Sequence, residues 1–187
     1  VLQVPMVMSV WDDGYGISVA REHQTTKDSI SEALAGMQRT EEKPGYEIFV
    51  TKGWDYPHLC ETYEKAVKLA REEHVPVLVH VKDVNQPQGH STSGSHERYK
   101  NEARLKWEVD FDCNSKFKEW ILNFDADGLS IATEEELDQI QKESKKSVNN
   151  DKRAAWSAFS ASLKLDMDAA LTLIKAAANG SSNAAFI

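Results

Sequence analysis

The stretch VPMVMSVWDDGYG, residues 4–16, joins an apolar run to two aspartates and a turn with two glycines. An apolar run without alternation is typical of a strand that is covered on both faces of a sheet. We therefore predict a buried strand over Val4–Val10 that ends at Asp12 and Asp13. It resembles a central strand, and central strands normally have earlier neighbours. We therefore expect this chain to be a piece of a longer protein that lacks its N-terminal part.

The segments that follow predict an α/β layer. A helical pattern over residues 29–38 precedes a short strand, Tyr46–Val50, and an amphipathic helix over Pro57–His74 precedes the strand VPVLVHV, residues 75–81. Strands that alternate with helices in this order favour a mainly parallel sheet. The predicted fold class is α/β, with a partial doubly wound sheet flanked by helices.

The second part of the sequence predicts helices without strands. A short helix is expected over Lys116–Phe124, and Thr133 with Glu136 forms a capping-box signature that begins a longer helix. The polar run NNDKR, residues 149–153, predicts a break before the amphipathic segment over residues 154–178. We therefore expect a helical C-terminal extension that ends in a linker-like tail.

Composition excludes several classes of protein. The 187 residues carry a formal net charge of −8, which is unlike a nucleic-acid-binding surface. No apolar run approaches the ~20 residues of a membrane-spanning helix, and the N-terminus lacks the basic flank of a signal peptide. Cys60 and Cys113 have no metal-type spacing. We expect a cytoplasmic protein with two buried, reduced cysteines and no nucleic-acid or membrane partner.

Asp12 and Asp13 form the first candidate site. They follow a predicted parallel strand, and ligands of open α/β sheets bind at the carboxyl edge. Hard cations such as Mg²⁺ take carboxylate and carbonyl oxygens, and the flanking glycines would let the backbone present the carbonyl of Tyr15. The alternative is that both aspartates only cap the strand in Asx-type turns. The local pattern leaves both interpretations open.

The long polar segment Lys82–Asn101 is the second candidate site, because loops of this length in compact domains are usually functional or disordered. His90 follows a glycine and precedes a Ser-Thr-Ser run. A positioned histidine can shuttle protons, and the hydroxyl run with Arg98 and Lys100 could bind an anion or accept phosphate. A solvated loop with incidental histidines is the alternative.

Three stretches in this order resemble the alpha subunit of the thiamine-diphosphate-dependent 2-oxo acid dehydrogenases, the decarboxylating component of the pyruvate and branched-chain complexes. WDDGYGIS resembles the family's strand ending in Asn-Asn-x-Tyr, and VTKGWD resembles its Val-x-Gly-x-Asp segment. GHSTSGSHERYK resembles its active-site loop. The resemblance covers roughly Val4 to Lys146, and the Ser-Thr-Ser run is similar to the branched-chain type.

The resemblance implies roles for particular residues. Asp13 and the carbonyl of Tyr15 would bind the Mg²⁺ that clamps the diphosphate of thiamine diphosphate. His90 would assist proton transfer at the reaction centre. Ser91 would lie at the cofactor and match a serine that is a regulatory phosphosite in some members, and the pair at 99–100 matches a Tyr-Arg pair.

The resemblance also implies domains and partners. Residues 1–130 would be the C-terminal part of a thiamine-diphosphate-binding domain, and residues 131–187 a helical extension and possible linker to a beta half. A beta subunit or fused beta half would complete the site. A 2-oxo acid would be decarboxylated and its acyl group passed to the lipoyl domain of the transacylase. The chain alone is expected to be inactive.

The sequence departs from the family pattern in ways that add negative charge. The family's Gly-Asp-Gly, which supplies the first Mg²⁺ carboxylate, is expected upstream of residue 1. Asp13 replaces a neutral asparagine, and Gln86 stands where a basic residue is common. An added charge at ~4 Å costs about 1 kcal/mol in water and more when partly buried. Either Arg21 or Lys82 compensates, or cofactor binding is weaker than in the family.

Two other functions compete with this interpretation. An acidic α/β scaffold with one long loop and an amphipathic helix could be a non-catalytic module that docks a partner. A phosphate-ester hydrolase could use Asp12 or Asp13, but it would need a second carboxylate cluster at another strand end. The C-terminal helix fits either a connector to a beta half or a surface helix of its own domain.

Overall fold

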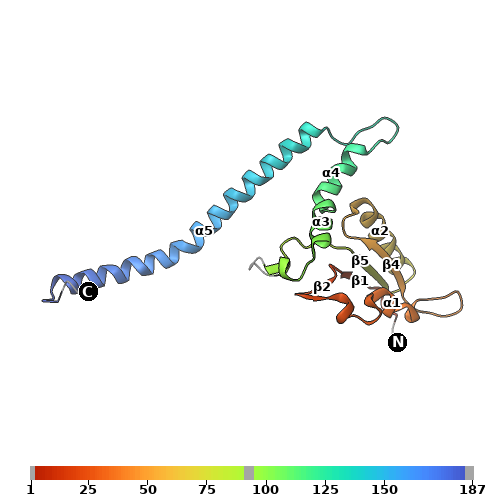
Figure 1. Ribbon diagram of the computed structural model, residues 1–187, viewed down its shortest axis with the longest axis horizontal. Helices are drawn as coiled ribbons and strands as arrows, with labels where there is room; N and C mark the ends of the chain where they lie inside the picture. Colours follow the sequence, from red (N-terminus) through yellow and green to blue (C-terminus); the bar gives the residue numbers. More distant parts are fainter. Residues whose placement is uncertain (1–2, 91–94, 184–187) are drawn as a thin grey trace. The chain divides into compact units, whose positions relative to one another are not determined.

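The computed structural model describes residues 3–90 and 95–183 (Figure 1). The chain divides into two compact units, Val1–Ile131 and Ala132–Ile187. The first unit contains the strands and most of the helices, and the second consists mainly of one long helix. Each unit is described separately below.

A parallel three-stranded sheet forms the centre of the first unit. Its strands are β1 (Val7–Trp11), β4 (Glu47–Lys52) and β5 (Val77–Lys82), in the spatial order β1-β5-β4 (Figure 1). Val77 is the register partner of both Val7 and Glu47, so the three strands end at one common edge. The predicted α/β class, with a parallel sheet flanked by helices, is confirmed.

The middle position of the sheet belongs to β5 and not to β1. β5 is buried along almost its whole length, whereas β1 is half-buried or exposed. Within the described residues β1 is an edge strand, so the prediction of a buried central strand at Val4–Val10 is wrong here. The physical reason is that neighbours on both sides bury a strand, and β1 has β5 on one side.

Helix α2 (Tyr56–Glu72) covers one face of this sheet. Asp55 begins the helix by accepting a hydrogen bond from the His58 amide at 3.2 Å. Ala66 and Ala70 pack against alternate residues of β5, Val77, Val79 and Val81, which form the main hydrophobic cluster. Because side chains alternate along a strand, His80 points to the opposite face.

Short elements lie between β1 and β4. They are β2 (Tyr15–Gly16) with β3 (Val19–Ala20), α1 (Ile30–Ala33), and the 3₁₀ turns η1 (Arg21–His23), η2 (Thr26–Asp28) and η3 (Ala35–Met37). The single helix predicted over residues 29–38 is thus one α-helical turn followed by a 3₁₀ turn. Its start at Ser29, whose hydroxyl accepts from the Glu32 amide, agrees with the prediction.

Two helices follow β5 and the short 3₁₀ turn η4 (Ser95–Arg98). Helix α3 (Glu102–Asp110) was not predicted, because its charged sequence shows little apolar periodicity and its one buried residue is Glu108. Helix α4 (Cys113–Asn123) begins three residues before the predicted Lys116, because Asp112 caps it by accepting from the Ser115 amide at 2.9 Å.

The two cysteines differ from the prediction of buried thiols. Cys60 is exposed, because it precedes the buried Thr62 by two residues on α2 and therefore faces away from the sheet. Cys113 is half-buried and lies 3.6 Å from the carbonyl oxygen of Gly53. Burial raises the pKa of the Cys113 thiol. Both cysteines are free thiols.

The second unit contains the continuous helix α5 (Glu134–Asn179), which has 46 residues. The predicted capping box is present: the Thr133 hydroxyl accepts from the Glu136 amide, and the Glu136 carboxylate accepts from the Thr133 amide. The break predicted at residues 149–153 is wrong, because that run contains no Pro or Gly and costs a helix only tenths of a kcal/mol per residue. None of the described helices has the length and apolar character needed to cross a membrane.

Candidate functional site

The two aspartates lie at the carboxyl edge of the parallel sheet, as the sequence predicts. The amide of Asp12 donates to the carbonyl of Val81 at 2.8 Å, and the carbonyl of Asp12 accepts from the amide of Val84 at 3.1 Å. The end of β1 is therefore tied to the end of β5. Gly14 follows with a φ of 84°, a left-handed conformation that turns the chain back into β2.

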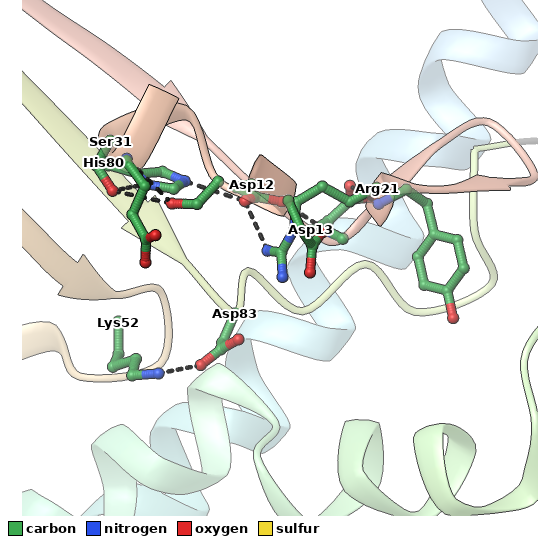
Figure 2. A network of polar contacts seen from close by, with 12 residues as sticks. Asp12, Asp13, Arg21, Ser31, Lys52, His80 and Asp83 are labelled. Atoms are coloured by element: carbon green, nitrogen blue, oxygen red, sulfur yellow. Dashed lines mark hydrogen bonds and ion pairs between the residues drawn. The ribbon is translucent and has the colours of Figure 1, made fainter. Parts of the chain in front are cut away.

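Asp12 is enclosed by hydrogen-bond donors (Figure 2). Its Oδ2 lies 2.7 Å from Nη1 of Arg21 and 3.0 Å from Nε2 of His80, and its Oδ1 accepts from the Gly14 amide at 2.9 Å. Burial acts to raise the pKa of Asp12, but the hydrogen bonds from Arg21, His80 and the Gly14 amide outweigh it. The pKa therefore lies below its ordinary value of 3.8.

A buried chain of hydroxyls continues from Asp12 through His80. The imidazole of His80 is fully buried, and its Nδ1 lies 2.9 Å from Oγ of Ser31, which lies 3.1 Å from Oγ of Ser29. An ionised carboxylate only accepts, so Nε2 of His80 donates to Asp12, and in a neutral ring Nδ1 then accepts from the Ser31 hydroxyl. Because the Ser31 side chain is itself buried, this chain fixes Asp12 in place and does not present a nucleophile.

Asp13 faces His90, which belongs to the segment 83–90 after β5 that we call the histidine loop. Its Oδ1 accepts from the Tyr15 amide at 3.1 Å, and its Oδ2 lies 3.2 Å from Nε2 of His90. The other ring nitrogen of His90 lies 3.2 Å from the carbonyl oxygen of Ile17. The structure thus brings together three of the four predicted site residues, Asp13, Tyr15 and His90. The fourth, Ser91, lies outside the described residues.

Both interpretations of the aspartates find support in these contacts. Asp12 and Asp13 each accept from the amide two residues further on, which is the Asx-type turn of the strand-capping alternative. Asp12 has both oxygens engaged by donors, and one of these donors is the cationic side chain of Arg21, which is half-buried. Asp13 uses one oxygen for its turn and turns the other toward His90, so it is the aspartate that remains suited to a ligand.

A cavity of about 150 Å³ opens beside the two aspartates. Asp13, Tyr15, Arg21 and His80 contribute to its wall, together with the exposed side chain of Trp11. The donors that fit a hard cation are the carboxylate of Asp13 and the carbonyl of Tyr15. Among the residues that the structure describes, no three His, Cys, Asp or Glu side chains cluster as a metal site. A cation here would therefore complete its shell with water or phosphate oxygens.

Among the described residues, the strand ends offer no second carboxylate cluster of the kind a phosphate-ester hydrolase would need. Asp83, directly after β5, forms an ion pair with Lys52 at the end of β4 (Figure 2). Arg21 is shared between Asp12 and Asp28, at 2.7 and 2.8 Å. Arg21 was one of two residues expected to offset the charge of Asp13. It forms ion pairs with two other carboxylates instead.

Three residues contribute to the site but were not predicted from the sequence: His80, Arg104 and Glu108. Nη2 of Arg104 donates to the carbonyl of Asp13 at 2.9 Å across 91 positions of sequence. His80 carries a signal, a polar residue inside the apolar strand VPVLVHV, whereas Arg104 and Glu108 look like ordinary helix surface. Lys100, considered above for anion binding, is instead buried and lies 2.7 Å from the Glu108 carboxylate.

Residues 1–163 match the model of a protein family described as the dehydrogenase E1 component. The chain belongs to the dehydrogenase E1 component family. The match covers both candidate stretches and agrees with the resemblance to an alpha-type component of a 2-oxo acid dehydrogenase. E1 components are oxidoreductases that act in 2-oxo acid decarboxylation, and they generally depend on thiamine diphosphate. They generally partner with a beta subunit and a lipoyl domain.

Searches of curated proteins and of solved structures returned no match.

The environment of Asp12 predicts how acid affects this E1 component. Because the pKa of Asp12 is lowered in the folded protein, its ionised carboxylate stabilises the fold at pH values above the ordinary pKa of 3.8. This contribution is lost as the pH falls through the folded-state pKa. Asp12→Asn should lower the free energy of unfolding near neutral pH by about 1–3 kcal/mol. It should also flatten the dependence of that free energy on pH below about 4. Urea unfolding at several pH values measures both effects, and an unchanged acid slope would contradict the assignment.

Proposed function

We propose that this E1 component decarboxylates a 2-oxo acid with thiamine diphosphate that Asp13 and the Tyr15 carbonyl hold through Mg²⁺. The observation that carries this proposal is the 3.2 Å contact between Asp13 and His90, which joins the two candidate stretches at the carboxyl edge of the sheet. The donors are the hard oxygens that Mg²⁺ prefers, and the adjacent cavity has room for an ion with a few waters.

The chain's own residues would bind, orient and move a proton. When bound, the cofactor supplies the electron sink for decarboxylation. Asp13 and Tyr15 would fix the diphosphate end through the cation. The Ile17 carbonyl orients the ring of His90, so that Nε2 faces the Asp13 side and is the atom that would take up or release a proton. Ser91 would lie next to His90 at the cofactor and remains a candidate phosphosite.

The decisive experiment is a calorimetric titration of thiamine diphosphate into the full-length protein with its beta subunit or beta half, with and without Mg²⁺. Binding that requires Mg²⁺ would support the proposal. No binding in the complete assembly would overturn it and favour the docking-module alternative. The rates of decarboxylation of pyruvate and of branched 2-oxo acids then show which of these two substrate classes the enzyme takes. A reducing cytoplasmic location, which the two free thiols favour, completes the proposal.

Helix α5 supports the proposed partner. Six of its exposed apolar residues recur at helical spacing and form what we call the α5 stripe: Trp156, Phe159, Leu163, Met167, Leu171 and Ile174. A helix that exposes such a stripe gains stability when a partner covers it. We infer that the beta subunit or fused beta half covers the α5 stripe, and that the lipoyl domain meets the assembled protein elsewhere.

A charge placed on the α5 stripe should prevent this association. Phe159 is 63% exposed, so Phe159→Glu leaves the isolated chain folded but would bury a carboxylate in the interface. We expect at least a tenfold weaker association with the beta region, a fold-change equal to about 1.4 kcal/mol, in analytical ultracentrifugation or calorimetry. Ala158→Glu, on the other side of the helix, is the matched control. Equal effects of both substitutions would contradict the stripe as the interface.

A further inference from the structure

Arg104 connects helix α3 to the candidate cation site. Its guanidinium donates through Nη2 to the carbonyl of Asp13 at 2.9 Å and through Nε to Glu108 at 3.1 Å. The guanidinium carbon lies 4.4 Å from the ring centre of Trp107 and 5.6 Å from that of Tyr15. Two ring contacts and two hydrogen bonds thus hold this side chain, which limits the positions it can adopt.

Glu108 links Arg104 to the histidine loop. The carboxylate of Glu108 is buried and also binds Lys100, whose ammonium donates to the Gln86 carbonyl at 3.0 Å. Four residues after Gln86 lies His90. The Lys100–Glu108–Arg104 cluster therefore runs from the loop that carries His90 to the backbone of Asp13, and Asn85 adds a bond from the same loop to the Phe111 carbonyl at 3.3 Å.

The charge of this cluster complements Asp13. Two cations and one carboxylate leave one net positive charge among Lys100, Arg104 and Glu108. Arg21, the other nearby arginine, is shared by Asp12 and Asp28. Arg104 is thus a cation bonded to Asp13, the residue whose carboxylate stands where the family has a neutral asparagine. The contact is part-buried, so charges interact more strongly there than in bulk water.

We propose that Arg104 is a positioning residue that offsets the charge of Asp13 and fixes the turn that presents Asp13 and the Tyr15 carbonyl to the cation. This inference rests on the proposed function, because the group being positioned is the proposed Mg²⁺ ligand. Arg104 is not itself one of the proposed ligands of the cation. Glu108 and Lys100 hold the guanidinium in place and keep the histidine loop at a fixed distance from the same turn.

A double-mutant cycle in the full-length protein with its beta region separates this role from simple stabilisation. Arg104→Gln should weaken thiamine diphosphate binding at saturating Mg²⁺ by about tenfold, because it removes a charged donor. In an Asp13→Asn background, where the charge to be offset is gone, the same substitution should cost less than about threefold. Arg104→Lys, which keeps the charge, should retain most of the affinity.

The controls decide between the possible outcomes. Lys106→Gln removes an exposed cation from the same helix and should leave the affinity unchanged. Thermal unfolding of each variant identifies any that are not folded, in which case Arg104→Lys carries the comparison. The same loss in both Asp13 backgrounds would overturn the role of Arg104 in offsetting the charge of Asp13, and no loss in either would overturn the whole inference, while in both cases the proposed function stands. No binding by the unchanged protein would overturn both.

Discussion

Replacing Asp13 by alanine is expected to weaken Mg²⁺-dependent binding of thiamine diphosphate by about 100-fold, which is the upper end of the range for residues that only support a metal ligand, because Asp13 is itself the proposed ligand. The carboxylate is the side-chain oxygen donor that faces His90 at the sheet edge, and alanine supplies no replacement. Calorimetric titration of the cofactor into the complete assembly, at several Mg²⁺ concentrations, measures the loss.

Two further substitutions show whether the effect belongs to the ligand oxygen. Asp13→Asn keeps an oxygen at the same position and should retain binding. Asp12→Ala removes a carboxylate one residue away that Arg21 and His80 already enclose, so it should reduce stability much more than Mg²⁺ affinity. If Asp12→Ala and Asp13→Ala lost the same cofactor affinity, the assignment of separate roles to the two aspartates would be wrong.

Glu108→Gln is expected to lower the free energy of unfolding of the first unit by about 3–5 kcal/mol, the usual cost of breaking a buried ion pair. The carboxylate of Glu108 is 7% exposed and the side chain of Lys100 only 2%, so the substitution leaves a buried ammonium without its counter-ion. Urea unfolding followed by tryptophan emission measures the change, since Trp107 lies on the same helix.

The matched control for Glu108 is Glu119, which pairs with Lys116 at 2.9 Å on α4 but is 59% exposed. Glu119→Gln should change stability by no more than about 1 kcal/mol, because exposed ion pairs contribute little. A double variant, Glu108→Leu with Lys100→Met, should recover part of the lost stability, because it removes the buried ammonium together with its counter-ion and leaves Arg104, which is 20% exposed and still bonded to the Asp13 carbonyl. A loss for Glu108→Gln as small as that for Glu119→Gln would contradict the buried pair.

The elements that sequence predicts well are those that supply apolar side chains to the main hydrophobic cluster. β4, β5 and α2 were predicted because residues such as Phe49, Val79 and Ala66, which form or pack against that cluster, are apolar. α3 was missed because the residue it buries is Glu108, whose burial depends on Lys100 and Arg104. The break predicted inside α5 was wrong because polarity alone does not end a helix.

The residues of the candidate site also differ in how far they could be predicted from the sequence. Asp13, Tyr15 and His90 could be predicted because each lies in a short motif with recognisable neighbours. Arg104 and His80 reach the aspartates across 91 and 68 positions of sequence, and no local pattern records such a contact. The contact of His80 with Asp12 follows from the parallel pairing of β1 with β5, and the contact of Arg104 with Asp13 depends on where helix α3 lies. Sequence predicts the class of sheet but not these side-chain partners.

The pairing of Val7 with Val77 has a consequence for how the chain acquires its site. Contacts between residues so far apart in sequence form late and slowly, because the chain must lose the entropy of closing a long loop before these contacts can stabilise it. Asp13, His90 and Arg104 meet only after that closure. A ligand that bridges them would therefore bind the completed fold and no partly folded chain. Its binding energy would add directly to the stability of the folded state.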